Sequence, residues 1–530
     1  MNDHSQISKA AYLAGRTLFH VDAFGAVGDG IHDDAVAIRN CCEAAAKLQK
    51  PAAVVFTAGK VYYADSLEEK FPWTSPWSQT TVLYFEHARD IVIEGNGCRL
   101  ELGPSTGCFF NLYSEKLVYH DLIVDHRIPT FISGTVEEMD GEGRFLRVQT
   151  AYPMDENLTD GEYVFPIDQD LYYASPNYRS PLRRRFLPIQ RIVSEGDCRY
   201  RVYPRHYEQA VDSVRELGLN TPWMWPSGSA GHGKGLICGM KFCGDVTFRN
   251  VEFQSGDCFM FYFQGNVGDI RFYDSHVRPN ARYGTNYMTT GRDIFHCVDN
   301  RGAFIWENCS IWWAGDDFMN ICDTTSYVDS VDGCAIKLRS MEFKGLVSYQ
   351  PGDTLEAYDR ITGRYYGTAT VVKVEDETNY LDVPFLGIEG NPNIRVNCPN
   401  LAAPNSRIHN CRIAGTGRFK GKIEVTDTYF DVQVLWLMQE GDYEGPIPKE
   451  VVFRNCVFDI GDIEIAAYDR GVPGSDFTEI GPLVDVRFYR CHFNGIHFVE
   501  KNQAAGKYTD CVFDNCTHGD KCRFEIEPHT

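Results

Sequence analysis

The chain has 530 residues, of which 43% are hydrophobic and 13% aromatic, and its formal net charge at pH 7 is −22. This length is ample for a large buried core and would by itself allow several domains. The excess of 73 acidic over 51 basic side chains disfavours nucleic acid and anionic membrane surfaces as partners. No apolar run is long enough to predict a transmembrane helix.

Two further features bear on location. Residues 1–16 are polar and contain no apolar signal segment, which predicts a cytoplasmic protein, or a secreted one if a leader has been trimmed away. The 19 cysteines are an odd number in a long chain, which favours free thiols in a reducing compartment over a disulfide framework.

Near the N-terminus, the acid pair Asp33-Asp34 precedes an amphipathic pattern. It predicts a helix over about residues 35–50, with Asp33 as N-cap and Asp34 in the first turn. The stretch resembles the N-terminal cap of the pectate-lyase-like right-handed parallel β-helices, a resemblance that implies a helix covering the open end of the solenoid.

A short template then recurs along the chain. It consists of alternating apolar residues, an Asn or Asp, often a Cys, and then an aromatic residue. Without an insertion the spacing is 20 to 25 residues; Asn250 to Asp274, for example, is 24. A repeat of this length made of short strands and tight turns predicts a parallel β-helix. One position of the template would form an internal cysteine ladder of Cys309, Cys411, Cys456, Cys491 and Cys511.

The template fails in two places, which we interpret as small inserted β-barrels. The predicted divisions are a cap and first coils (1–126), barrel 1 (127–205), a loop and central coils (206–333), barrel 2 (334–396) and C-terminal coils (397–530). The fold class is therefore all-β: a right-handed parallel β-helix with an N-terminal capping helix and two barrel insertions.

Acidic residues recur at the coil spacing. Asp257, Asp293 and the pair Asp316-Asp317 each follow a Gly-containing turn, and Asp293 to Asp316 is 23 residues, about one coil. Carboxylates stacked on neighbouring coils would suit glycosidic bond cleavage, in which one acid protonates the leaving oxygen and another activates water. Calcium binding and structural turn acids are the alternatives.

The order of β-helix, barrel, acidic coils, barrel and β-helix, together with the stretch Gly315–Ile321 and the run Trp436–Gly441, resembles glycoside hydrolase family 110, the inverting exo-α-galactosidases. The resemblance implies that Asp293, Asp316 and Asp317 carry catalysis, with Asp316 or Asp317 as general acid and the other two acids positioning water. It further implies a terminal α-galactosyl substrate with an α-1,3 linkage, and no cofactor or metal. An inverting pair is expected to lie about 6.5–9.5 Å apart.

Six residues are candidates for contacts with the sugar: Asp257, Arg292, His296, Trp312, Trp313 and Glu440. Each also has an ordinary interpretation, as a core aromatic, a hydrogen-bonded histidine or a solvated charge. Trp306 alternates toward the strand interior and is predicted to be core. Cys511, Cys516, His518 and Cys522 have spacings that match no standard zinc site.

Two other functions stay open. One is an endo-acting polyuronide hydrolase of the polygalacturonase type, which would need a basic groove; Arg418 and Lys420 are the only hint of one. The other is a non-catalytic glycan-binding β-helix, against which the acidic column argues. A homo-oligomer is possible.

Overall fold

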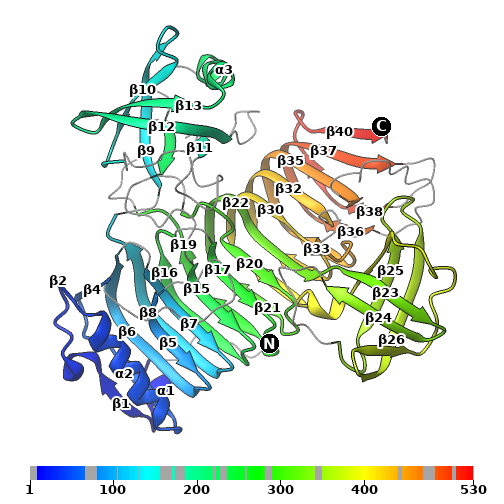
Figure 1. The fold of residues 1–530 in the computed structure, drawn as a ribbon, viewed down its shortest axis with the longest axis horizontal. Helices are drawn as coiled ribbons and strands as arrows, with labels where there is room; N and C mark the ends of the chain where they lie inside the picture. Colours follow the sequence, from blue (N-terminus) through cyan, green and yellow to red (C-terminus); the bar gives the residue numbers. More distant parts are fainter. Residues whose placement is uncertain are drawn as a thin grey trace.

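The computed structural model describes residues 9–65, 80–103, 106–128, 131–154, 170–173, 186–217, 219, 222–226, 236–256, 259–280, 289–340, 349–439, 444–468, 484–503 and 509–528. Its body is a right-handed parallel β-helix, from which two closed β-barrels project (Figure 1). Fold class, capping helix and both inserted barrels are as predicted. Within the described residues, no helix has the length and apolarity needed to cross a bilayer.

A small cap covers the N-terminal end of the β-helix (Figure 1). It consists of α1 (Lys9–Leu13), β1 (Thr17–His20), η2 (Val21–Phe24), β2 (Asp29–Asp33), α2 (Ala35–Lys47), β3 (Ala52–Val55) and β4 (Val61–Ala64). The predicted cap residue was wrong by one position, because Asp34 is the N-cap of α2 and the helix ends at Lys47. The Asp34 carboxylate accepts the backbone N–H groups of Val27 and Gly28 instead of capping the helix. Asp33 accepts the N–H of Ala35.

The coils of the β-helix stack strand on strand in parallel register. The first coils contain β5 (Thr80–Glu86), β6 (Arg89–Leu102), β7 (Thr106–Leu112) and β8 (Glu115–His126). The central coils contain β15 (Leu236–Lys241), β16 (Val246–Phe253), β17 (Phe259–Gln264), β18 (Ile270–Tyr273), β19 (His276–Val277), β20 (Phe295–Val298), β21 (Phe304–Glu307) and β22 (Ser310–Thr324).

The C-terminal coils continue the same stack. They contain β29 (Ser406–His409), β30 (Arg412–Arg418), β31 (Ile423–Thr426), β32 (Tyr429–Gln439), β33 (Glu444–Gly445), β34 (Val451–Arg454), β35 (Val457–Tyr468), β36 (Val484–Tyr489), β37 (His492–Gln503), β38 (Thr509–Asp514), β39 (Thr517–His518) and β40 (Arg523–Pro528).

Stacked aromatic rings fill the interior. Phe248 and Phe272 on neighbouring coils are parallel, with ring centroids 4.5 Å apart, and Phe272 continues onto Trp306 at 6.1 Å. Trp306 is 1% exposed, which confirms its predicted core position. Parallel register puts the same template position of each coil over the last, so ring stacks on ring.

The Asn or Asp of the template forms a ladder at one corner of the β-helix. These residues adopt left-handed backbone conformations, with φ near +50° at Asn250, Asp274, Asn308, Asn410, Asp427 and Asn455, as Asn and Asp tolerate best among non-glycine residues. Their side chains bond from coil to coil: Asn308 donates to Asp274 at 3.1 Å, and Asn410 donates to Asn308 at 2.8 Å. We call these six Asn and Asp residues the corner ladder. They therefore form the turns and also bond through their side chains from one coil to the next.

The cysteine ladder follows one residue later, and the prediction was wrong at its last step. Cys309, Cys411, Cys456 and Cys491 are buried, and Cys516, after Asn515, continues them with its thiol on the carbonyl of Phe488. Cys511 instead lies on β38, in register with Val486. All 18 described cysteines are free.

Each inserted barrel has six strands. Barrel 1 is formed by β9 (Phe131–Asp140), β10 (Phe145–Thr150), β11 (Asp170–Tyr173), β12 (Phe186–Gly196), β13 (Arg199–Pro204) and β14 (Pro222–Pro226). Barrel 2 is formed by β23 (Ser326–Asp332), β24 (Ala335–Ser340), β25 (Thr354–Asp359), β26 (Tyr365–Glu375), β27 (Thr378–Leu381) and β28 (Ile394–Asn397). Both extend beyond the predicted 127–205 and 334–396. The stretch 206–235, expected to be a loop, contains α3 (Tyr207–Leu217) and β14.

Candidate active site

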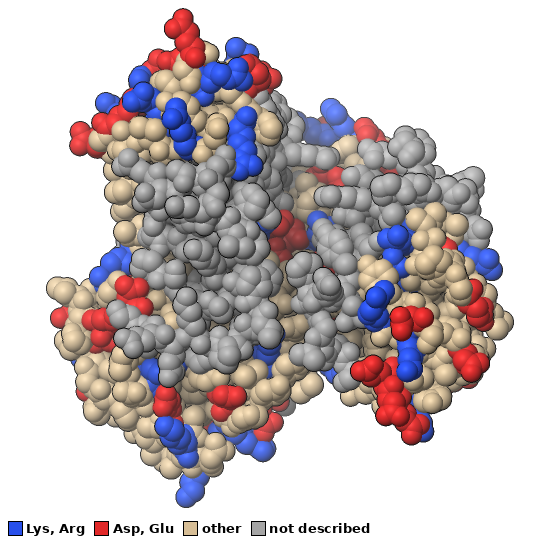
Figure 2. Space-filling view, viewed as in Figure 1, with Lys and Arg blue, Asp and Glu red and all other residues tan. Residues whose placement is uncertain are grey.

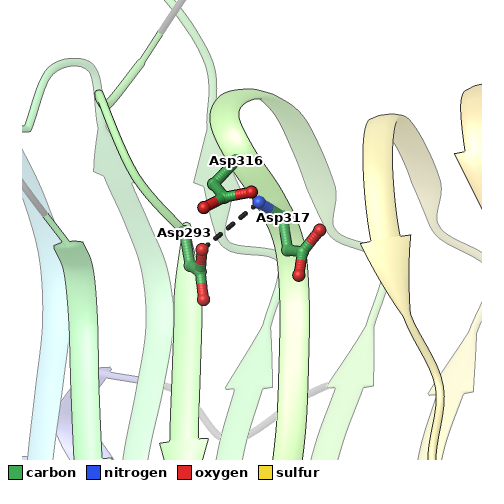
Figure 3. Close-up of side chains that lie close together, drawn as sticks. All are labelled: Asp293, Asp316 and Asp317. Atoms are coloured by element: carbon green, nitrogen blue, oxygen red, sulfur yellow. Dashed lines mark hydrogen bonds between the residues drawn. The ribbon is translucent and has the colours of Figure 1, made fainter. Parts of the chain in front are cut away.

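Three aspartates meet where β20 and β22 lie side by side. Asp293 comes two residues before β20, and Asp316 and Asp317 lie within β22. The strands pair in parallel with Phe295 opposite Met319, which sets the acids on neighbouring coils. The backbone N–H of Asp317 donates to Asp293 Oδ1 at 3.3 Å. Figure 3 shows the three side chains together at the bend of β22.

The bend of β22 is a strained corner. Trp313 has φ of +53°, a conformation that bulky residues rarely adopt. Two contacts hold it there: the N–H and hydroxyl of Thr289 both donate to the Trp313 carbonyl. Beyond the corner, the N–H of Gly315 donates to the Thr290 carbonyl at 2.8 Å. Strain of this kind at a bend that carries acids is typical of a functional site.

The three carboxylates are very close. One oxygen from each of Asp293, Asp316 and Asp317 lies within 4.8 Å of the others. This is shorter than the 6.5–9.5 Å expected for an inverting pair and closer to the separation of about 5–5.5 Å typical of retention. Three carboxylates in this arrangement could also bind a hard cation. However, Arg292 and Arg418 lie beside two of them, which weakens the site for a divalent ion.

Asp293 is buried, with 3% of its surface exposed. Its Oδ2 lies 2.7 Å from Nδ1 of His296. Burial raises the pKa of the Asp293 carboxyl above its ordinary value; the His296 contact opposes this rise, and the charges of Asp316 and Glu444 add to it. Asp293 is thus a stronger base than a solvated aspartate.

Asp317 is also buried and is held by an arginine. The Arg418 Nε donates to Asp317 Oδ2 at 3.0 Å. The same guanidinium lies over the Trp436 ring, 4.3 Å from its centroid, and the indole N–H of Trp436 donates to Glu464 at 2.7 Å. This row crosses β22, β30, β32 and β35, so three coils support one carboxylate.

Asp316 is the accessible acid of the three. Its side chain is 34% exposed, against 5% for Asp293 and 4% for Asp317. The Arg292 guanidinium lies 3.6 Å from its carboxylate. Asp316 therefore forms the solvent-facing side of the cluster.

A second, buried polar group lies beside the acids, and the sequence had not assigned it. Lys420 Nζ donates to Asn320 Oδ1 at 2.9 Å and to Glu444 Oε2 at 3.1 Å. Asn320 also donates to Glu444 at 2.7 Å. Glu444 Oε1 is 4.0 Å from Nε2 of His296. The signal for Glu444 was present as a second Glu-Gly pair, four residues after the predicted Glu440.

The other predicted contact residues have separate surroundings. Arg292 and His296 belong to the cluster, as described above. Trp313 is only 9% exposed, and Trp312 is half-buried, with the Arg412 guanidinium 5.2 Å from its ring centroid. Asp257 and Glu440 lie outside the described residues.

Comparison with known proteins gives fold-level likeness only. No protein-family model matches the chain, and no curated protein matches it. Among solved structures, the chain is similar to an exopolygalacturonase of Thermotoga maritima (10% identity, 99% of this chain and 92% of that chain, TM-score 0.41). It is also similar to an endo-xylogalacturonan hydrolase of Aspergillus tubingensis (9%, 96% and 95%, 0.40) and to the Streptococcus pneumoniae surface adhesin PfbA (12%, 96% and 100%, 0.37).

Proposed function

We propose that this protein is a glycoside hydrolase that removes a terminal α-galactosyl residue. The observation that carries the proposal is the cluster of Asp293, Asp316 and Asp317, whose oxygens lie within 4.8 Å on two neighbouring coils. Holding three carboxylates this close, two of them buried, is costly unless the charges are used. Glycosidic cleavage uses such a set as acid and base.

The surroundings of each acid suggest a division of roles. Asp293 and Asp317 would together position water, and Asp293, whose pKa is raised, would take its proton. Arg418 pairs with the Asp317 carboxylate at 3.0 Å. Asp316, the solvent-facing acid, would protonate the leaving oxygen, and Arg292, 3.6 Å away, would stabilise the carboxylate that forms when the proton leaves.

The charges of the site favour a neutral sugar over a uronate. Each fixed cation of the described site already faces a carboxylate: Arg292 faces Asp316, Arg418 faces Asp317 and Lys420 faces Glu444. A polyuronide would need additional cations for its own carboxylates. Figure 2 agrees for the face it draws, where the described Lys and Arg alternate with Asp and Glu and form no continuous basic stripe.

The stereochemical outcome has two candidates. The resemblance to family 110 implies inversion by an activated water. The short carboxylate separation favours retention, in which one aspartate attacks the sugar and forms a covalent intermediate.

Proton NMR of wild-type protein on α-1,3-galactosyl disaccharides tests the proposal. Initial release of β-galactose establishes inversion, and α-galactose establishes retention. Wild-type protein that releases no galactose but cleaves polygalacturonate would replace the proposal with the polyuronide alternative. If glycans are bound unchanged by wild type and Asp317→Asn and none is cleaved, the protein is a binding protein. Loss of activity in EDTA that calcium restores would turn the acid cluster into a metal site.

The role of Asp316 has its own test. On an aryl α-galactoside with an activated leaving group, which needs little protonation, Asp316→Asn is expected to keep most of its activity, whereas Asp293→Asn loses it. On the natural disaccharide both variants are expected to be inactive. Equal losses of both variants on both substrates would overturn the division of roles.

A further inference from the structure

The buried group of Lys420, Glu444 and Asn320 lies behind the acid cluster. Lys420 is 2% exposed, Asn320 3% and Glu444 5%. A buried lysine and a buried glutamate are costly to maintain unless they are paired and fully hydrogen-bonded. Here they bond to each other and to a shared amide. The group reaches the proposed machinery at the His296 ring, which lies 4.0 Å from Glu444.

Separate parts of the chain supply this group. Glu444 comes from β33, which pairs antiparallel with the end of β22 through Gly445 and Asp323. Lys420 follows β30, and Asn320 lies on β22 opposite His296 on β20. A two-residue strand far from the acids in sequence thus sets the position of Glu444.

His296 lies between two carboxylates. Its Nδ1 is 2.7 Å from Asp293 and its Nε2 is 4.0 Å from Glu444. The ring also stacks on Tyr262, with centroids 5.5 Å apart, and contacts Phe259 at 4.7 Å. Among the described residues, the charged groups recorded against the ring are Asp293 and Glu444. Next to these lie Asp316 and Asp317, with Arg292, Arg418 and Lys420 paired to the surrounding carboxylates.

We propose that Glu444, held by Lys420 and Asn320, is a positioning residue that orients His296 so that Nδ1–H donates to the proposed base Asp293. This inference rests on the proposed function for its catalytic consequence. Carboxylates only accept, so the carboxylates at the two imidazole nitrogens are both satisfied only when each nitrogen carries a proton. Glu444 on the Nε2 side thereby holds the ring with Nδ1–H directed at Asp293. Glu444 reaches Asp293 through this ring and through its own charge, so we expect it to act on turnover more than on sugar binding.

The experiment compares Glu444→Gln, Lys420→Met and Lys420→Arg with wild type. Glu444→Gln is expected to lower kcat by about tenfold with KM nearly unchanged, as supporting residues typically do. Lys420→Met should cause a similar loss, and Lys420→Arg, which keeps the cation, should restore part of it. The matched control is Glu356→Gln, because Glu356 in barrel 2 is also buried and bonds a lysine, Lys449, at 2.6 Å.

A second readout does not depend on activity. In protein with 15N-labelled histidine, the Nδ1–H of His296 is expected to give a slowly exchanging signal in wild type and in Glu356→Gln. It should exchange at least about tenfold faster in Glu444→Gln. An unchanged signal, or a loss confined to KM, would overturn the positioning role. If wild type cleaves no glycoside but its Nδ1–H signal still exchanges more slowly than that of Glu444→Gln, the proposed function is overturned and this inference stands.

Discussion

Two columns of polar side chains run along the β-helix, and they accommodate carboxylates on neighbouring coils in different ways. In the corner ladder, an amide stands next to each carboxylate: Asn308 donates to Asp274, and Asn455 donates to Asp427. In the acid cluster, carboxylate stands next to carboxylate, with oxygens within 4.8 Å. Stacking repeats whatever the template supplies, so an acid at the same position of two coils becomes an acid pair unless an amide separates them.

The difference shows what the acid cluster requires. In the corner ladder, neutral amides make the contacts from coil to coil, and cations such as Arg249 lie beside the acids. In the cluster no amide separates the three acids, and Arg292, His296 and Arg418 are paired with them. The ladder therefore separates its carboxylates with amides, whereas the cluster offsets its carboxylates with cations.

Asp293→Asn should have the largest effect. We expect activity on an α-galactosyl disaccharide to fall roughly a thousandfold, as for loss of a general base. Stability at neutral pH should rise. The folded-state pKa of Asp293 is raised, so the protonated Asp293 favours folding below its unfolded-state pKa, and this contribution is lost as pH rises through the folded-state value. At neutral pH the buried Asp293 is ionised and costs stability, a cost that the neutral Asn removes. Activity assays measure the first effect, and thermal unfolding measures the second. The control Asp274→Asn in the corner ladder should retain activity. Equal losses of activity in both variants would contradict the difference between the corner ladder and the acid cluster.

The second-largest expected effect is the loss of stability in Arg418→Met. It would leave Asp317 buried without its cation, and we expect unfolding in denaturant to become easier by about 3 kcal/mol. The side chains of this pair are 8% and 4% exposed. Arg249→Met is the matched control, since Arg249 is equally buried but its ladder partner Asp274 is 42% exposed, and its loss should be smaller. Adding Asp317→Asn to Arg418→Met should recover most of the loss. If the double variant is no more stable than the single one, the buried charge is not the cause.

The pH dependence of activity is a smaller effect. Asp293 must be ionised to act as base, so activity should fall as pH decreases through its raised pKa, above the range of an ordinary aspartate. His296→Gln removes the imidazole whose hydrogen bond and charge lower that pKa. The acidic limb of kcat/KM should therefore move to higher pH by about one unit. A limb that stays in place, or moves to lower pH, would show that Asp293 does not control it.

The sequence predicts the fold and the three acids for one reason. Short-range repetition sets both the coil length and the 23-residue step from Asp293 to Asp316. What it does not predict depends on insertions. Arg418 contacts Asp317 from 101 residues away, across barrel 2, where coil counting stops. Glu444 was not predicted because its position depends on a two-residue β-bridge. Cys511 was confused with Cys516 because the repeat lengths vary near the C-terminus.

The smallest predicted effect comes from a substitution that puts two carboxylates side by side in the corner ladder, as they are in the acid cluster. Asn308→Asp would put a carboxylate against Asp274 in place of an amide. Since like charges now face each other, stability at pH 7 should fall by about 0.5–1 kcal/mol and recover below about pH 4 as the pair takes up a proton. Asn455→Asp makes the same change beside Asp427, but Arg490 donates to this residue at 2.8 Å, so its loss should be close to zero. Denaturant unfolding at both pH values measures the difference. Equal losses in the two variants would mean that a neighbouring cation does not make stacked acids tolerable, and the contrast between ladder and site would need another cause.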